Sequence, residues 1–156
     1  MDNVFPEDLD DEELELEEMD DDSEEESEGY KRSVCFDEEL GDFKRDGTKK
    51  LVECTGIEAW IQWCTKILQT KRYVCQVYSD DIGIDIESAF QAESRAAAEN
   101  ILRNEIMEAL EADPYGRTEY VEAVSFQWFG ADSVEVTCSV MGIDSNEIEF
   151  NVSIER

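Results

Sequence analysis

The last third of the chain contains three segments in which apolar and polar residues alternate. The apolar positions are Val124, Phe126 and Trp128, then Val134, Val136, Cys138 and Val140, then Ile148, Phe150, Val152 and Ile154. Because successive side chains of a strand point to opposite faces, this period of two predicts strands with one apolar face and one polar face. The turn sequences FGAD and MGIDSN separate the segments. The pattern therefore predicts an antiparallel three-stranded meander.

Two helices are predicted before the meander. Residues 55–58 have the Thr-x-x-Glu spacing of a capping box, and the apolar residues that follow up to Leu68 recur at helical spacing. A second amphipathic helix is predicted over residues 93–111, and Asp113-Pro114 stops it because proline cannot continue a helix. Both helices can cover the apolar face of the meander. The predicted fold class is α+β, with two amphipathic helices packed on the C-terminal antiparallel three-stranded meander.

Between the two helices, residues 71–79 read KRYVCQVYS and alternate with a period of two, which predicts a further strand. Lys71 and Arg72 are placed at the end of the first helix, where cations complement the helix dipole. Tyr73 is expected to pack into the fold. We interpret the whole stretch as a helix-to-strand scaffold segment.

The N-terminal part has a different composition. The chain carries 13 Lys plus Arg against 42 Asp plus Glu, for a formal net charge of -29, and residues 1–28 alone hold 17 acids and no base. Such a segment cannot bury enough apolar surface to order itself. We therefore predict an acidic low-complexity tail at 1–29, disordered or ordered only by a partner. An extended arm at 30–54 with a turn at Asp46-Gly47 follows, and then an α+β domain at 55–156.

Charge and residue usage argue against several functions. An excess of acids repels phosphate groups and anionic lipid, so we expect no nucleic acid and no membrane as partner. No apolar run approaches the roughly 20 residues of a membrane span. The chain has no histidine, and its five cysteines show no metal-ligand spacing, so they are predicted to be reduced, mostly buried thiols.

Catalytic signatures are absent from the sequence as well. Asp80, Asp81, Asp85 and Glu87 form the densest carboxylate group of the folded part, but their spacing differs from that of a Ca²⁺-binding loop. No glycine-rich phosphate loop or nucleophile elbow is present. We predict no enzymatic activity, no metal and no cofactor.

The last predicted strand points to binding. Its sequence EIEFNVSIE alternates regularly, and an uncovered strand edge invites another protein to add a strand through main-chain hydrogen bonds. The candidate partner-binding residues of this strand are Ile148, Phe150, Val152 and Ile154. An equally good alternative is that an early segment of the chain itself, such as SVCF, pairs with this edge.

The order of these parts resembles a known family. The helix ending in LQTKRYVCQVYS with DIG shortly after it, and the helix ending in EALEADPY just before the meander, are similar to the XkdS-like family of phage baseplate proteins. These are distant relatives of the small wedge protein that initiates the sheath of contractile tails. The resemblance covers residues 30–154. It implies a fold similar to the docking domain of the tail sheath.

In the wider wedge family the second helix ends in a Glu-Pro-Arg signature, and the resemblance implies that this signature is an assembly contact. Asp113, Pro114 and Tyr115 occupy that place here. Tyrosine replaces the arginine, and Arg117 can substitute for it from two residues on. All four residues are therefore predicted partner-binding residues.

The resemblance implies a structural baseplate component of a contractile phage tail or of a headless bacteriocin particle, assembled in the host cytoplasm. Its sheet would dock the first ring of the tail sheath protein, and its other surfaces would bind baseplate wedge proteins and, as further candidates, tail tube or hub proteins. For the acidic tail we hypothesise that it occupies a basic groove on a neighbouring baseplate subunit or on the tail tube. Two alternative functions are an acidic regulator or nucleic-acid mimic that binds a basic protein, and a cell-wall hydrolase.

Overall fold

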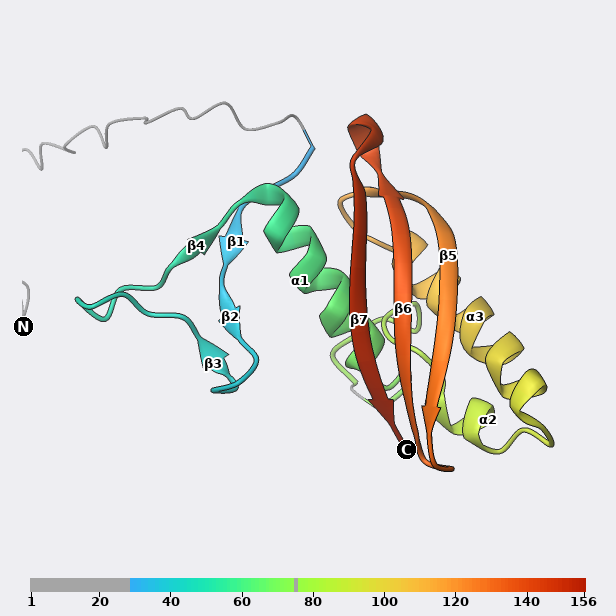
Figure 1. Cartoon of the computed structure of the whole chain (residues 1–156). Coiled ribbons are helices and arrows are strands. Elements are labelled where there is room, and N and C mark those ends of the chain that lie inside the picture. Colours follow the sequence, from blue (N-terminus) through green and yellow to red (C-terminus); the bar gives the residue numbers. More distant parts are fainter. Residues whose placement is uncertain (1–28, 75) are drawn as a thin grey trace, which may run out of the picture.

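A computed structural model of the chain describes residues 29–74 and 76–156 (Figure 1). The predicted acidic tail at 1–29 therefore lies outside the described residues, apart from Gly29. In chain order the elements are β1 (Ser33–Val34), β2 (Phe36–Asp37), β3 (Asp42–Phe43), β4 (Glu53–Cys54), α1 (Gly56–Gln69), α2 (Ile86–Phe90), α3 (Arg95–Glu111), β5 (Thr118–Phe129), β6 (Ser133–Gly142), a 3-10 turn (Ile143–Ser145) and β7 (Glu147–Glu155).

The C-terminal sheet is antiparallel with strand order β5-β6-β7, as the alternation predicted. The alternating apolar residues that the sequence singled out on the two strands are buried, and the other side chains of these strands face solvent to different degrees. Both long helices lie on the same side of the sheet, where α1 packs against β7 and α3 against β5 (Figure 1). The α+β fold class is confirmed, and the short helix α2 is an addition to it.

Helix α1 begins where its sequence predicted. The backbone amide of Thr55 donates to Glu58 Oε2 at 3.0 Å, and the amide of Glu58 donates to Thr55 Oγ1 at 3.4 Å, which completes a capping box. Trp60, Cys64 and Leu68 are fully buried on the face that meets the sheet. Burying this stripe is what holds the helix against β7, since an isolated helix of this length is marginal in water.

Residues 30–54 form an arm that projects from the helix and sheet body (Figure 1). Its strands pair with one another, β1 with β4 and β2 with β3, so the SVCF segment does not pair with β7. The arm turns at Asp46, whose Oδ1 accepts the backbone amides of Thr48 at 2.8 Å and Lys50 at 2.9 Å. This matches the turn predicted at Asp46-Gly47.

The strand predicted over residues 71–79 is wrong. The described part of this segment consists of turns, and only Lys71 makes a single bridge, to Ile84. Tyr73 has a left-handed backbone with φ of 67° and is 67% exposed, so the prediction that it packs is also wrong. The alternation misled because it resembles a half-buried strand, whereas Val74 and Val77 both point to solvent here.

Candidate functional site

The end of α3 is fixed by a buried ion pair. Arg117 binds Asp113 in bidentate fashion, with Nε at 2.7 Å from Oδ2 and Nη2 at 2.9 Å from Oδ1. The same carboxylate accepts the backbone amides of Arg117 at 3.0 Å and Tyr115 at 3.2 Å. Both charged side chains are almost completely buried. We call this pair the helix-end clip.

Aromatic rings surround the clip. The Arg117 guanidinium carbon lies 5.6 Å from the ring centre of Trp63 and 5.1 Å from that of Tyr115, distances at which a cation is attracted to the ring face. Lys31 Nζ lies 4.9 Å from the ring of Tyr115 on the way into the arm. Trp63 therefore faces a second element of its own chain.

The clip also holds the turn before β7. The backbone amide of Ile143 donates to the carbonyl of Arg117 at 3.0 Å, and the hydroxyl of Tyr30 donates to the carbonyl of Ile143 at 2.7 Å. Gly142, next to Ile143, has no room for a side chain, because a Cβ there would lie 2.4 Å from Tyr30 Oη and 2.5 Å from Trp60. Four parts of the chain therefore meet at one point, namely the end of α3, the start of β5, the β6–β7 turn and the entry to the arm.

Among the four signature residues, the structure separates two kinds. Asp113 and Arg117 bind each other inside the fold, an intrachain ion pair that the sequence analysis did not predict. Pro114 and Tyr115 are exposed, Tyr115 by 55%. Only this Pro-Tyr corner has side chains that a partner can contact, and its role in assembly stays a prediction.

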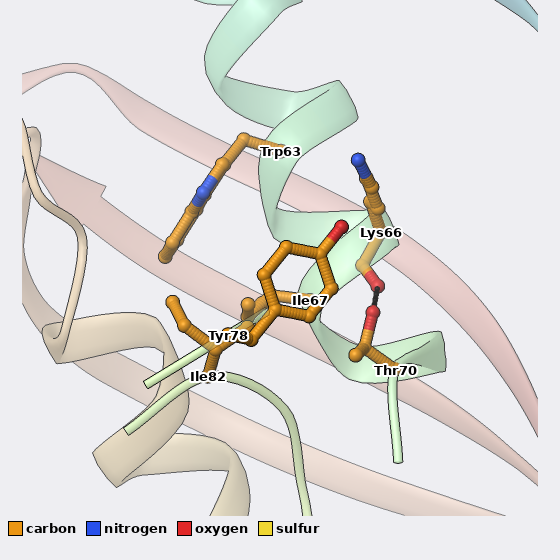
Figure 2. Close-up of a pocket in the computed structure, with 6 residues that line it drawn as sticks. All are labelled: Trp63, Lys66, Ile67, Thr70, Tyr78 and Ile82. Carbon is orange, nitrogen blue, oxygen red and sulfur yellow. Dashed lines mark hydrogen bonds between the residues drawn. The ribbon is translucent and has the colours of Figure 1, made fainter. Parts of the chain in front are cut away.

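The hollow beside Trp63 is too small for a typical small-molecule ligand, whereas two hollows between the arm and α1 measure about 310 and 570 Å³. Figure 2 shows Trp63, Ile67, Tyr78 and Ile82 around the first, which has a volume of about 90 Å³. This is well below the roughly 300 Å³ of a small-molecule pocket. Within residues 29–74 and 76–156 there is no cluster of His, Cys, Asp or Glu suited to a metal ion, and no helix is long and apolar enough to cross a membrane.

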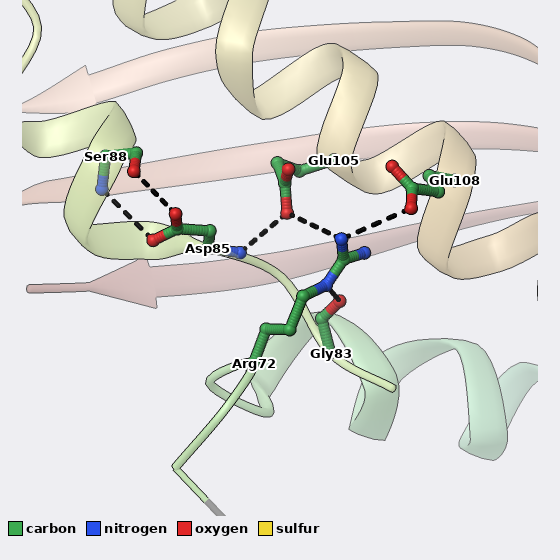
Figure 3. A network of polar contacts seen from close by, with 6 residues as sticks. All are labelled: Arg72, Gly83, Asp85, Ser88, Glu105 and Glu108. Carbon is green, nitrogen blue, oxygen red and sulfur yellow. Dashed lines mark hydrogen bonds and ion pairs between the residues drawn. The ribbon is translucent and has the colours of Figure 1, made fainter. Parts of the chain in front are cut away.

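Arg72 makes contacts with α3 that the sequence did not predict. Instead of lying along the dipole of α1, it reaches to α3 and places Nη1 3.5 Å from Glu105 and 3.3 Å from Glu108 (Figure 3). Its Nε donates to the carbonyl of Gly83 at 3.0 Å. Glu105 in turn accepts the amide of Asp85 at 2.8 Å. Arg72 therefore closes the loop between α1 and α2 against α3.

β7 is an edge strand of the sheet. Each of its residues from Glu147 to Glu155 has a partner on β6, and no described residue pairs with its other side. The register tells which backbone groups are free. Arg156 donates its amide to Asp132 and Gly142 donates its amide to Asn146, so the pairs that involve even-numbered residues are the hydrogen-bonded ones.

The open groups of β7 therefore belong to the odd-numbered residues. These are Glu147, Glu149, Asn151, Ser153 and Glu155, whose amides and carbonyls point away from β6. The four residues singled out from the sequence, Ile148, Phe150, Val152 and Ile154, bond to β6 and bury their side chains under α1. Alternation alone could not separate the two sets, since it gives the direction of side chains and not that of backbone bonds.

The other edge of the sheet is irregular. β5 pairs with β6 through two register shifts, between Thr118 and Tyr120 and between Val121 and Ala123. Such bulges leave a residue unpaired and twist the strand, which protects an edge from further pairing. β7 has no register shift along its length. Of the two edges, only β7 offers a regular template.

Comparison with known proteins agrees with this architecture. A family model described as the contractile injection system sheath initiator matches residues 32–145, which run from the arm through α1, α2, α3, β5 and β6. The search of curated proteins returned no match. Because the family model spans well over half of the chain, the protein belongs to the contractile injection system sheath initiators.

Proposed function

We propose that β7 is the edge through which this structural component of a contractile injection system docks the first ring of the sheath. An extended arm of a sheath subunit would lie beside β7 and continue the sheet. Family membership supports an interaction with sheath and baseplate components. The regular, open edge supports the form that we propose for the sheath contact.

The geometry of the edge carries the proposal. A strand added to β7 would meet the free amides and carbonyls of its odd-numbered residues, at a spacing fixed by the β6–β7 register. Each main-chain hydrogen bond of this kind contributes about 0.5–1.5 kcal/mol net. Several in a row give useful affinity without any deep pocket, as in other cases of strand addition.

For the baseplate wedge proteins we propose a second surface, made of the arm and the Pro-Tyr corner. The arm exposes apolar side chains that a folded domain normally buries, and its turn is basic in an otherwise acidic protein. The apolar residues are Phe36, Leu40, Phe43 and Leu51, and the basic ones are Lys44, Arg45, Lys49 and Lys50. Exposed apolar groups next to charge are typical of protein-binding surfaces.

The variant Asn151→Pro tests the sheath contact. The amide of Asn151 points to the open edge, so proline removes an outward donor without breaking a bond to β6. Its matched control is Asn151→Ala, because both variants lose the hydrogen bond that Thr137 Oγ1 makes to Asn151 Oδ1 at 2.7 Å. The readout is co-sedimentation of the purified protein with sheath subunits of its own particle.

We expect Asn151→Pro to weaken sheath binding at least tenfold, since it removes a donor and places the proline ring in the path of the added strand. Asn151→Ala should bind as the parent does. Thermal melts of both variants check that the domain stays folded. If folded Asn151→Pro docks sheath as well as Asn151→Ala, strand addition at β7 is not the mode of docking.

A further inference from the structure

From the side chains that border the open edge, we infer the chemistry of the strand that β7 receives. It carries Lys or Arg at alternate positions on the solvent side of the sheet, and apolar residues at the positions between them, which face α1. This inference rests on the proposed function, because it requires that a strand pairs with β7. It adds which sequences that strand can have.

The solvent side of β7 is acidic. Its side chains are those of Glu147, Glu149, Asn151, Ser153 and Glu155, the same residues whose backbone groups are free. In an antiparallel pair, the side chain directly opposite lies 4.5–5.5 Å away between Cβ atoms, so each added residue on this side meets one of them. Opposite charges in such pairs attract and like charges repel.

Nothing on the sheet neutralises these carboxylates. Residues 118–155 contain eight acids and no Lys or Arg. No ion pair found among the described residues involves a carboxylate of β7. The neighbouring contact is a hydrogen bond, from Ser139 Oγ to Glu147 Oε1 at 3.2 Å. A strand with acids on this side would add to the repulsion, whereas cations would relieve it.

The helix side of the edge selects for apolar groups. At the end of β7 a hollow of about 250 Å³ is lined by the apolar residues Leu68, Ile86 and Ile154 and by the polar residues Gln69, Lys71, Ser153 and Glu155. The cation of Lys71 disfavours a second cation beside it. A side chain that points from an added strand toward α1 near this end enters the hollow. Apolar residues gain free energy there by leaving water.

Charge on one side and apolar groups on the other also fix the register of the incoming strand. Because side chains alternate, a shift by one residue would place the cations against the helix and the apolar groups opposite the glutamates. The edge therefore rejects strands in the wrong register and strands with acidic solvent sides. The backbone bonds alone cannot make this distinction, since every sequence offers the same amides and carbonyls.

The test uses the full chain and three synthetic peptides of equal length, in which valine alternates with lysine, glutamine or glutamate. Binding is measured by fluorescence anisotropy at low and high salt. We expect the lysine peptide to bind roughly tenfold more tightly than the glutamine peptide if three charge pairs form, and the glutamate peptide more weakly than either. Added salt should reduce the advantage of lysine.

Two triple variants show whether the effect is local. Glu147→Gln/Glu149→Gln/Glu155→Gln removes the acids of the edge, and Asp80→Asn/Asp81→Asn/Glu87→Gln removes the same charge from exposed residues elsewhere. The first should lose the preference for lysine, whereas the second should keep it. If both keep it equally, the preference reflects overall charge, and the inferred pattern is wrong.

Sheath co-sedimentation separates this inference from the proposal beneath it. If Asn151→Pro abolishes docking while the edge triple variant docks sheath with the parent's affinity and salt dependence, strand addition stands and the cationic pattern is refuted. If Asn151→Pro docks normally, strand addition itself fails, whatever the peptides do. Loss of docking in both variants, with the control triple variant unaffected, supports the two together.

Discussion

The helix-end clip gives the sharpest stability prediction, through the variant Arg117→Met. Methionine keeps an unbranched side chain between the rings of Trp63 and Tyr115 but removes the guanidinium. Asp113 then loses two of its four hydrogen bonds, those at 2.7 and 2.9 Å, and keeps only the backbone amides of Arg117 and Tyr115. Its carboxylate stays buried with no countercharge from the clip.

The expected loss of unfolding free energy is about 3–5 kcal/mol, the usual cost of removing one partner of a buried ion pair. For a domain of this size this corresponds to a decrease in melting temperature of roughly 10–25 °C. Arg103→Met on α3 is the control, since its half-exposed guanidinium donates to Asn100 at 3.3 Å and carries no buried pair. It should cost less than about 1 kcal/mol.

Urea denaturation at pH 7 measures both variants. Asp113→Asn/Arg117→Met should be destabilised by less than the sum of the two single changes, since neither charge is left alone. An Arg117→Met loss below 1 kcal/mol would refute the reasoning.

Two further predictions follow from buried groups. Arg72→Met should free the loop at residues 73–82 from α3 and make it a site of rapid limited proteolysis, whereas Lys71→Met, a change of an exposed neighbour, should leave the cleavage rate unchanged. Burial raises the pKa of the Cys64 thiol and raises that of Cys138 to about 12. Both thiols therefore keep their protons in the folded protein at a pH above 9, whereas in the unfolded chain they lose them near pH 9. Stability should therefore decrease as pH increases above about 9, by up to about 1.4 kcal/mol per pH unit for each thiol. Replacing both by alanine should flatten this decrease.

Most of the architecture could be predicted because local and tertiary signals agree in it. The capping box at Thr55 and the stop at Asp113-Pro114 set the ends of the two long helices close to their observed positions. The meander was predicted from a strict period of two in the sequence, and the side chains of β6 and β7 alternate between buried and more exposed with the same period. In these segments the residues that favour an element are also the ones that the core buries, so sequence reasoning is reliable.

Residues 71–79 show where this agreement ends. The segment alternates like a strand, but its described residues form turns with a single bridge from Lys71 to Ile84, and the side chain of Arg72 binds carboxylates on α3. That contact links residues 36 positions apart in the case of Glu108. Periodicity reports local preference only, so it could not reveal a long-range ion pair that decides the path of the loop.

The family signature at the end of α3 can affect assembly without touching a partner. The backbone carbonyl of Arg117 accepts a hydrogen bond from the amide of Ile143, which lies in the turn between β6 and β7. The clip therefore holds this turn and, with it, the start of the open edge. A variant that breaks the clip would therefore weaken sheath docking by displacing β7, even if Asp113 and Arg117 never meet another protein. Tyr115→Ala tests the alternative, because it removes an exposed ring and leaves the ion pair in place. Loss of assembly at unchanged melting temperature would assign a contact to the Pro-Tyr corner, whereas normal assembly would leave the signature with an internal role alone.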